Sequence, residues 1–394
     1  MYFSPKTSAD GLVFHYDTGN TVRSYLGEPT TNLAYAVNSY LNSNSNWWIN
    51  AGNATFNDND TSIQKPTIPN VDTSNLRIFS STVTQTGGNQ QIGSSIITIS
   101  PSTTYSFSIY YYFTGTTMQA QPYVRTAVNN DSLAYFGYNG DTNYLNWPRN
   151  KWILLKATVT TQANENGIYM SSYTGDTLGE KLAYFGYQVE QKSHCTPLVL
   201  GTRSATQGLK DLTAANTINL TNVSFDSNAQ MTFDGTDDYV ITSNFPQLSN
   251  WTTELFLKPT VFTSAQKVIL DVNLGIRFEI SNGFFNSHFG NGSGWIYTNL
   301  PSTTSIAANK WFHVVVTVQS GGQAKVYVNS VLENSTNIGS GTTPNIPLYV
   351  GRFTGASGYE FNGEIPVTKI YNRALTADEV ARNYNAIKSR FNIG

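Results

Sequence analysis

Tryptophan stands near asparagine in three segments of the chain, and this combination is suited to sugar binding. The segments are Asn46-Trp47-Trp48-Ile49-Asn50, Tyr144-Leu145-Asn146-Trp147 and Asn291-Gly292-Ser293-Gly294-Trp295-Ile296-Tyr297. An aromatic ring complements the flat apolar face of a pyranose, and neighbouring amides can read its hydroxyl groups. The candidate carbohydrate-binding residues are therefore Trp47, Trp48, Trp147, Trp295 and Tyr297. Packing in a core stays open as an alternative, and one of Trp47 and Trp48 should be buried because adjacent strand residues face opposite ways.

Residues that could catalyse a reaction are few. The four histidines are His15, His194, His288 and His313, and no paired His or Cys spacing typical of zinc occurs. On a strand, His194 and Cys195 would point to opposite faces, so Cys195 is expected to be a buried structural thiol. Glycosidases need two facing carboxylates, and the acids here show no such pattern. The sequence predicts no enzyme, with a polysaccharide depolymerase as an alternative, because carboxylates can converge from distant strands.

Composition excludes several partners. Only 12% of the 394 residues are charged, about half of the usual share of roughly 25%, and 13% are aromatic. The net charge of −2 gives no electrostatic attraction for nucleic acid or acidic membranes. No apolar run approaches the length of a membrane helix. We therefore expect no nucleic acid and no membrane insertion, and a binding surface that responds little to salt.

The elements that carry these residues are predicted to be strands. Residues 314–318 and 325–328 are β-branched runs separated by Ser320-Gly321-Gly322, as in a hairpin. Thr376-Ala377-Asp378-Glu379 is a capping box, after which Val380, Ala381, Tyr384 and Ile387 share one helical face. The predicted fold class is all-β, with two β-sandwich or jelly-roll domains plus one short C-terminal α-helix.

Several separated motifs in the second half of the chain share a family resemblance. They are residues 233–240 (FDGTDDYV), 310–317 (KWFHVVVT), 326–329 (VYVN), 361–365 (FNGEI) and 370–376 (IYNRALT). In this order they resemble the laminin-G-like, concanavalin-type jelly-roll domain. The resemblance covers about half of the chain. It implies the fold much more strongly than a function, because this fold hosts lectins, glycanases, adhesins and virion proteins.

The resemblance also implies a metal. Laminin-G-like domains often hold calcium through carboxylates and carbonyls at loop tips, as an oxygen-seeking cation requires. Asp237 and Asp238 are the metal candidates, with Asp58 and Asp60 elsewhere in the chain. No further cofactor is expected. The alternative is that these aspartates are solvated turn residues.

The N-terminus indicates an insertion. Residues 10–20 (DGLVFHYDTGN) resemble the opening strand of the same jelly-roll family, whereas the expected continuation, Gly208-Leu209-Lys210-Asp211-Leu212-Thr213, lies far downstream. We therefore expect a discontinuous jelly roll over residues 1–27 and 204–394, with residues 28–203 inserted. An ordinary N-terminal tail is the alternative.

The insert is expected to be a second β-sandwich. Its strands are predicted at residues 96–100, 104–110, 151–159 and 182–190, and a Pro-Ser-Thr turn joins the first two. The closing strand, LAYFGYQVE, runs into Cys195-Thr196-Pro197. This arrangement resembles family-4/9-like carbohydrate-binding modules.

The C-terminal segment, IYNRALTADEVARNYNAIKSRF, resembles the ends of phage structural proteins. A single cysteine and no apolar leader fit a protein made in the host cytoplasm. We expect a bacteriophage virion surface protein (capsid decoration, head fibre or tail-fibre component) that contacts other virion proteins and adheres weakly to host-surface glycans. We also expect a homo-oligomer present in many copies. The alternative is a secreted bacterial lectin or adhesin, or the glycan-binding part of a carbohydrate-active enzyme.

Overall fold

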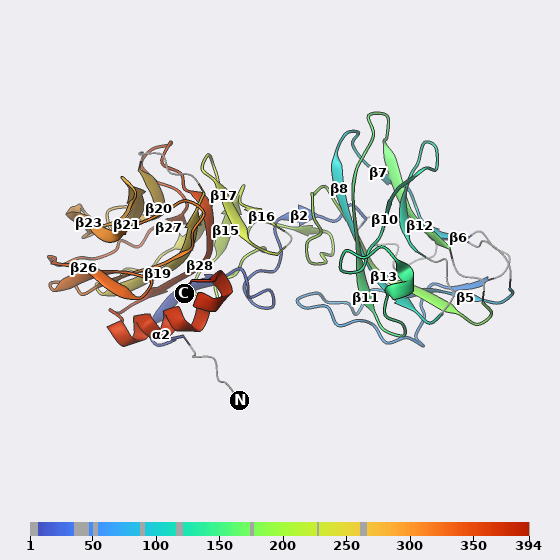
Figure 1. Cartoon of the computed structure of the whole chain (residues 1–394), viewed down its shortest axis with the longest axis horizontal. Coiled ribbons are helices and arrows are strands. Elements are labelled where there is room, and N and C mark those ends of the chain that lie inside the picture. Colours follow the sequence, from blue (N-terminus) through green and yellow to red (C-terminus); the bar gives the residue numbers. More distant parts are fainter. Residues whose placement is uncertain are drawn as a thin grey trace. The chain divides into compact units, whose positions relative to one another are not determined.

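The computed structural model describes residues 7–34, 47–49, 54–86, 91–115, 121–173, 177–226, 228–260 and 266–393. The chain divides into two compact units (Figure 1): unit 1 comprises Met1–Pro29 and Ser204–Gly394, and unit 2 comprises Thr30–Arg203. The boundaries lie two residues or fewer from the expected ones. Where the chain enters and leaves unit 2, β2 (Thr30–Thr31) pairs with β14 (Thr202–Arg203). That either unit folds by itself stays a prediction.

Unit 1 is a sandwich of two antiparallel sheets. The eight-stranded sheet has the order β16-β17-β28-β19-β24-β25-β26, with β1 also paired to β28. Its strands are β1 (Leu12–Asp17), β16 (Ser224–Phe225), β17 (Met231–Asp234), β19 (Trp251–Pro259), β24 (Phe312–Val318), β25 (Gln323–Val328), β26 (Val331–Asn337) and β28 (Asn362–Tyr371). The pairing of β1 with β28 places the N-terminal segment in the C-terminal sheet, as the sequence predicted.

The second sheet of unit 1 has seven strands in the order β15-β18-β27-β20-β21-β22-β23. They are β15 (Ile218–Thr221), β18 (Tyr239–Asn244), β20 (Lys267–Val272), β21 (Ile276–Ser281), β22 (Phe284–Gly290), β23 (Trp295–Ser305) and β27 (Pro347–Val350). Alternate residues of both sheets, among them Trp251, Phe278 and Val316, form one core between them. The predicted hairpin of β24 and β25 is confirmed.

Strand β24 is buried on both faces. Val314, Val316 and Val318 belong to the core between the sheets, whereas Val315 packs in a smaller cluster with Tyr371 and Val380. Val380 belongs to helix α2 (Ala377–Ile387), which covers the outer face of the sheet (Figure 1). Coverage of both faces explains why β24 is a continuous apolar run instead of an alternating one.

The predicted capping box is confirmed: the Thr376 hydroxyl accepts from Glu379 N, and the Glu379 carboxylate accepts from Thr376 N. The buried face differs from the expected one, because Asn383 is buried beside Val380 and Tyr384 while Ala381 is only half-buried. Asn383 is buried because it makes hydrogen bonds under the helix. Its amide donates to Glu254 Oε2 over 2.6 Å and its oxygen accepts from Ser8 N over 2.8 Å.

Glu254 is the centre of this buried polar network. It lies opposite Lys369 in the pairing of β19 with β28, and Lys369 Nζ lies 3.0 Å from Glu254 Oε1. His313 Nε2 lies 3.5 Å from the same oxygen. Burial opposes the charge of Glu254, but Lys369 and His313 outweigh it and lower the pKa of this carboxyl to about 2. His313 thus serves packing and polar contacts, as predicted.

Unit 2 is a second sandwich. Its six-stranded sheet has the order β10-β9-β12-β6-β3, with β7 also paired to β12, and its five-stranded sheet has the order β11-β8-β13-β5-β4. The strands are β3 (Trp47–Ile49), β4 (Ala54–Asn57), β5 (Phe79–Val83), β6 (Gln91–Ser94), β7 (Ile97–Thr98), β8 (Thr104–Phe113), β9 (Tyr123–Thr126), β10 (Ser132–Tyr135), β11 (Ile153–Thr160), β12 (Gly167–Tyr173) and β13 (Lys181–Glu190).

The predicted strands of the insert are present. The turn between the first two does not form a hairpin, because these strands do not pair with each other. The segment Pro101–Thr103 connects β7, which pairs with β12, to β8, which pairs with β11 and β13. The two strands therefore belong to different sheets. The turn carries the chain from one layer of the sandwich to the other.

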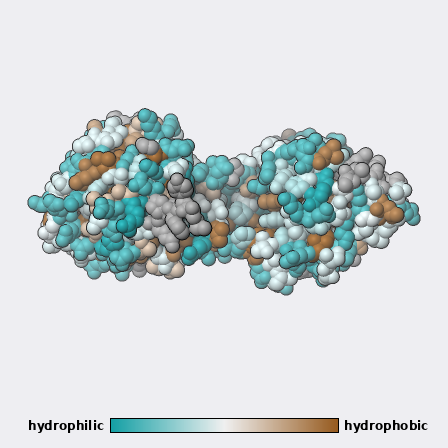
Figure 2. All heavy atoms as spheres, turned by 60° about the horizontal axis from the view of Figure 1, so that its bottom comes forward, coloured by the Kyte–Doolittle hydropathy of each residue, from teal (hydrophilic) through white to brown (hydrophobic). Residues whose placement is uncertain are grey.

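The prediction of an all-β fold with one short C-terminal α-helix is confirmed. Within the described ranges, no helix has the length and apolar character needed to span a bilayer. The face in Figure 2 shows hydrophobic residues only in small, separate patches among hydrophilic ones. Scattered apolar residues of this kind are normal on a protein surface.

Candidate functional site

A tyrosine-lined pocket lies on one face of the six-stranded sheet of unit 2. In β9, Val124 is fully buried in the core, so its neighbours Tyr123 and Arg125 lie on the opposite face. Tyr123 is opposite Tyr135 of β10 and Ser171 of β12, and the register therefore aligns these strands across the face. The pocket has a volume of about 200 Å³ and is lined by Gln121, Tyr123, Arg125, Ser132, Tyr135, Tyr144 and Tyr173.

The tyrosine rings form a continuous aromatic surface. The ring centroids of Tyr123 and Tyr135 are 5.8 Å apart, and those of Tyr123 and Tyr173 are 6.2 Å apart. Arg125 lies over the same ring, with its Cζ 5.0 Å from the Tyr123 centroid. Tyr135 is 54% exposed, so one wall of the pocket is open to solvent. Burial raises the pKa of Tyr123, which keeps this hydroxyl neutral.

Local structure fixes the polar rim of the pocket. Tyr144 begins the short helix η2 (Tyr144–Asn146), whose N-cap Asn143 accepts a hydrogen bond from Leu145 N. The Gln121 amide donates to the carbonyls of Phe136 and Thr142, which orients its side chain. The pocket therefore combines aromatic faces with hydroxyl and amide groups and one guanidinium. Aromatic faces beside hydroxyl and amide groups suit the binding of a sugar ring.

The structure contradicts the predicted sugar contact of Trp147. This side chain is only 3% exposed. Its ring lies edge-on to Tyr111 at 5.9 Å, and its Nε1 donates to the Asp141 carbonyl over 2.9 Å. Both the ring and its polar atom are thus used inside unit 2, and no face is left for a ligand.

Trp47 and Trp48 lie in β3, and their side chains lie outside the described part of the structure. The backbone register is described: Trp48 pairs with Gly93 of β6, and Gly93 pairs with Ser171 of β12. Ser171 in turn pairs with Tyr123. Trp48 therefore stands in the same register row as the pocket tyrosine, and its contact with sugar stays a prediction.

Trp295 and Tyr297 lie in β23 of unit 1, whereas the pocket belongs to unit 2. Both are half-buried. The Arg277 guanidinium lies 4.7 Å from the Trp295 ring and 3.9 Å from the Phe353 ring, and it bonds to Asp271 over 3.0 Å. Tyr297 packs near Phe289, with 6.3 Å between the centroids. A sugar contact at either residue stays a prediction.

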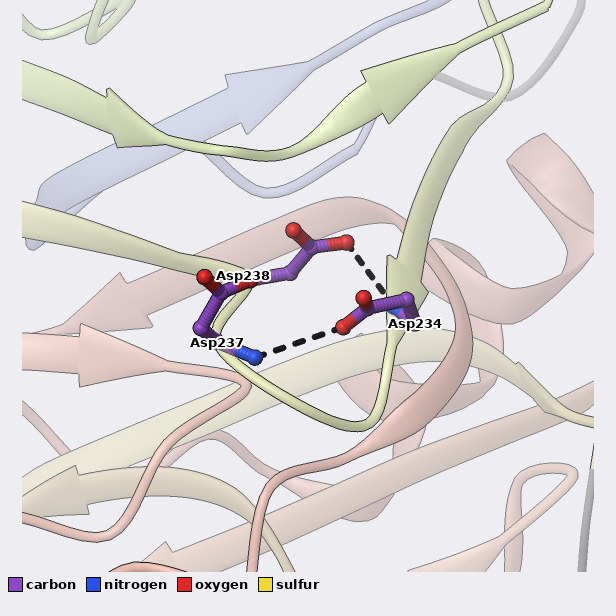
Figure 3. Close-up of side chains that lie close together, drawn as sticks. All are labelled: Asp234, Asp237 and Asp238. Carbon is purple, nitrogen blue, oxygen red and sulfur yellow. Dashed lines mark hydrogen bonds between the residues drawn. The ribbon is translucent and has the colours of Figure 1, made fainter.

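A second candidate site is the loop between β17 and β18, where Asp234 joins the two predicted metal candidates (Figure 3). One carboxylate oxygen from each of Asp234, Asp237 and Asp238 lies within 4.8 Å of the others. Asp238 accepts from Asp234 N over 2.8 Å, and Asp234 accepts from Asp237 N over 3.4 Å. Gly235 has a φ of +81°, which permits the tight Asp-Gly turn that the sequence predicted.

The three aspartates of this loop differ in environment. Asp234 and Asp237 are exposed, whereas Asp238 is only 4% exposed. Burial, reinforced by repulsion from Asp234 and Asp237, raises the pKa of Asp238 to about 6. A hard cation would relieve this repulsion, and carboxylate oxygens are the ligands that calcium prefers. The donor set therefore fits a calcium ion.

Asp58 and Asp60 have other partners. Asp60 is 4% exposed and bonds to Lys181, Ser62 and Ser80. Asp58 lies 3.4 Å from Arg77. Each carboxylate thus already has a cationic partner, and calcium binding at these two residues stays a prediction.

Cys195 follows β13 in an irregular segment, not in a strand. Its thiol donates to the Phe107 carbonyl over 3.0 Å, and burial raises its pKa to about 11. A protonated thiol is a poor nucleophile, so a structural role fits it.

The sequence analysis missed the pocket residues Tyr123, Arg125, Tyr135 and Tyr173. Their signal is alternation: Tyr123-Val124-Arg125-Thr126 places every second residue on one face. The segment contains neither tryptophan nor asparagine, the residue types on which the sugar-binding prediction rests. Asp234 was also missed, although it opens the turn that contains Asp237 and Asp238.

Comparisons with known proteins agree with this fold. Residues 234–381 match the family described as the concanavalin A-like lectin/glucanases superfamily. This match confirms the expected jelly-roll resemblance over that range. None of the curated proteins that were compared matches the chain.

Solved structures give weaker similarity. The binding domain of Paraclostridial Mosquitocidal Protein 1 is 17% identical, with a TM-score of 0.40 over 45% of this chain and 49% of that one. The botulinum neurotoxin serotype D ligand binding domain in complex with N-acetylneuraminic acid is 18% identical, with a TM-score of 0.38 over 46% and 49%. The chain thus spans about half the length of the structures that it matches.

Proposed function

We propose that this protein binds glycans without hydrolysing them, and that the tyrosine-lined pocket of unit 2 is the binding site. The observation that supports the proposal is the grouping of Tyr123, Tyr135, Tyr144 and Tyr173 around a cavity of about 200 Å³ on one sheet face. A cavity of this size suits one or two sugar residues of a longer chain. Such a small contact implies weak binding at each site.

The lining of the pocket supports binding over hydrolysis. Glycoside hydrolysis uses a pair of carboxyl groups that flank the scissile bond. The residues that line this pocket are tyrosines, an arginine, a glutamine and a serine, with no carboxyl group among them. Release of reducing sugars from bound polysaccharide by the purified protein would overturn this part of the proposal.

Two single substitutions test the site. Tyr135→Ala and Tyr173→Ala remove rings from an exposed and a half-buried position, so the fold should be retained. We expect each to weaken binding on a glycan array by about three- to tenfold, the usual effect of one aromatic contact. Trp295→Ala tests the alternative candidate site in unit 1, and it should leave binding unchanged if the pocket of unit 2 is the binding site. Loss of binding in Trp295→Ala alone would move the site to unit 1.

The proposed setting is the surface of a bacteriophage virion, with many copies displayed together. Its support is the resemblance of residues 370–391, which form the end of β28, helix α2 and η3 (Lys388–Phe391), to the ends of phage structural proteins. Weak single sites become collectively tight when they are repeated on a lattice. This fits a decoration or fibre protein that contacts other virion proteins and forms a symmetric homo-oligomer.

Immunogold labelling of purified particles tests the setting. Regularly spaced label on the capsid or on the tail would support it and would distinguish the two locations. Unlabelled particles, with the protein recovered in the culture medium, would favour a secreted lectin or adhesin instead. That second outcome would leave the pocket and its glycan binding intact.

A further inference from the structure

We infer that the pocket of unit 2 selects sugars that carry a carboxylate, and that Arg125 is the residue that recognises it. This inference rests on the proposed glycan binding and adds the class of sugar. Arg125 is the single charged residue among those that line the pocket. A neutral sugar needs stacking surfaces and hydroxyl partners, whereas a fixed positive charge beside them favours an anion.

The partners of Arg125 differ from those of four other arginines in the described part of the chain. Four of these contact a carboxylate: Arg77 with Asp58, Arg277 with Asp271, Arg373 with Glu379 and Arg390 with Asp17. No described carboxylate forms an ion pair with Arg125. Its Nε is buried without a hydrogen-bond partner among the described residues. A guanidinium that has no carboxylate partner and lies at the edge of a cavity can form an ion pair with the carboxylate of a ligand.

The position of Arg125 prepares it for this contact. Its Cζ lies 5.0 Å from the centroid of the Tyr123 ring, and β12 places Tyr169 beside it in register. Contact with aromatic rings restricts the guanidinium before any ligand arrives, so less conformational entropy is lost on binding. The planar fork can then donate two parallel hydrogen bonds to one carboxylate, a geometry that lysine cannot reproduce.

A contact between Arg125 and a sugar carboxylate should make binding weakly dependent on salt. One guanidinium-carboxylate contact at a partly open pocket is screened only modestly between low and moderate salt. We therefore expect affinity to fall a few-fold over this range, instead of the steep loss that a basic patch would show. The neutral counterpart of the same sugar should show no such dependence.

The test uses matched pairs of oligosaccharides. An array carries oligomers with glucuronate or galacturonate residues, each beside its carboxyl-reduced form, in which glucose or galactose replaces the acid. We expect the native protein to bind at least one acidic member about tenfold or more tightly than its reduced partner, the usual effect of a charge-assisted hydrogen bond. Arg125→Gln should abolish that preference and retain binding to the reduced member. Arg125→Lys should show an intermediate preference.

Lys151→Gln is the matched control, since it removes one positive charge from an exposed position of unit 2 outside the pocket. Circular dichroism and thermal unfolding confirm that each variant is folded. Equal binding to acidic and reduced members, or an acid preference that persists in Arg125→Gln, overturns the inference. If Tyr135→Ala still weakens binding in that case, the proposed glycan binding stands. If the native protein binds no member of any pair, both proposals fail.

Discussion

The environment of Asp238 disfavours the ionised form of its carboxyl group. Burial is the larger cause and the neighbouring Asp234 and Asp237 add to it, so the pKa in the folded protein is about 6. The unfolded chain has the ordinary value near 4, roughly that of a free aspartate side chain. The folded state therefore holds this proton more tightly, and the contribution to stability is present below about pH 4 and is lost as the pH rises through about 6.

The substitution Asp238→Asn should reverse this loss. The new amide would keep an oxygen that accepts from Asp234 N, and it would remove the repulsion. At about pH 7 we expect the free energy of unfolding to increase by on the order of 1 kcal/mol, after allowance for solvent screening, with no change at about pH 4. Urea denaturation at both pH values measures the difference. Asp237→Asn, at an exposed position, should shift stability much less.

Calcium should bind at the same loop. With about 1 mM calcium at neutral pH, we expect the melting temperature of the native protein to rise, because a ligand that binds only the folded state stabilises it. Asp238→Asn should lose this response, and magnesium, which demands tighter octahedral geometry, should give less. An unchanged melting temperature with calcium would leave these aspartates as turn residues.

For individual residues, the sequence predicted the Asp-Gly turn at Gly235 but did not predict the tyrosine-lined pocket of unit 2. Asp-Gly spacing predicted the turn because Gly235 readily adopts the backbone conformation that it requires, and the carboxylates follow directly. The pocket depends on which strands are neighbours: Tyr123, Tyr135 and Tyr173 come from three strands, and their grouping follows from a strand order that no local pattern contains. At Trp147, by contrast, a local pattern predicted a contact that the tertiary structure does not allow. Its segment looked suited to sugar, yet tertiary packing buried it.

Among the elements, the attachment of helix α2 depends on a buried charge network. Lys369→Met would leave the Glu254 carboxylate buried with Asn383 and His313 but without its ammonium partner. We expect this single change to cost about 3–5 kcal/mol in the free energy of unfolding. The double variant Glu254→Gln/Lys369→Met should recover a large part of that cost, because no buried charge then lacks a partner.

Chemical denaturation of the two single variants and the double variant measures this coupling. Arg77→Met is the matched control, since it breaks an ion pair whose two side chains are each 36% exposed, and it should cost less than about 1 kcal/mol. Additive effects of Glu254→Gln and Lys369→Met would show that the two residues contribute independently. The capping box predicted where α2 begins, but the sequence alone did not show that Asn383 faces inward, because its partners come from Ser8 and Glu254.

For the whole molecule, we predict that the two units can fold independently of each other. Thr31 pairs with Thr202 and Thr30 with Arg203, so the two crossings between the units lie side by side. A variant that lacks residues 28–203, rejoined by a short Gly/Ser linker, should fold as one cooperative β domain with a single unfolding transition. Residues 28–203 expressed alone should fold as well. If residues 204–394 fold alone while the rejoined variant does not, the insertion is contradicted.

The pairing of β1 with β28 leads us to expect an order of events during folding. The Tyr371 hydroxyl donates to the Ser8 carbonyl, which lies 363 residues earlier in the chain. Closing so long a loop in a disordered chain costs entropy that grows with its length. Once β2 has paired with β14, the residues of unit 2 no longer add to the length of the disordered loop. Strand β1 is then held near the other strands of its sheet. We therefore expect early folding of the insert to speed the closure of the jelly roll, and mutations that slow folding of the insert should delay the burial of Tyr371.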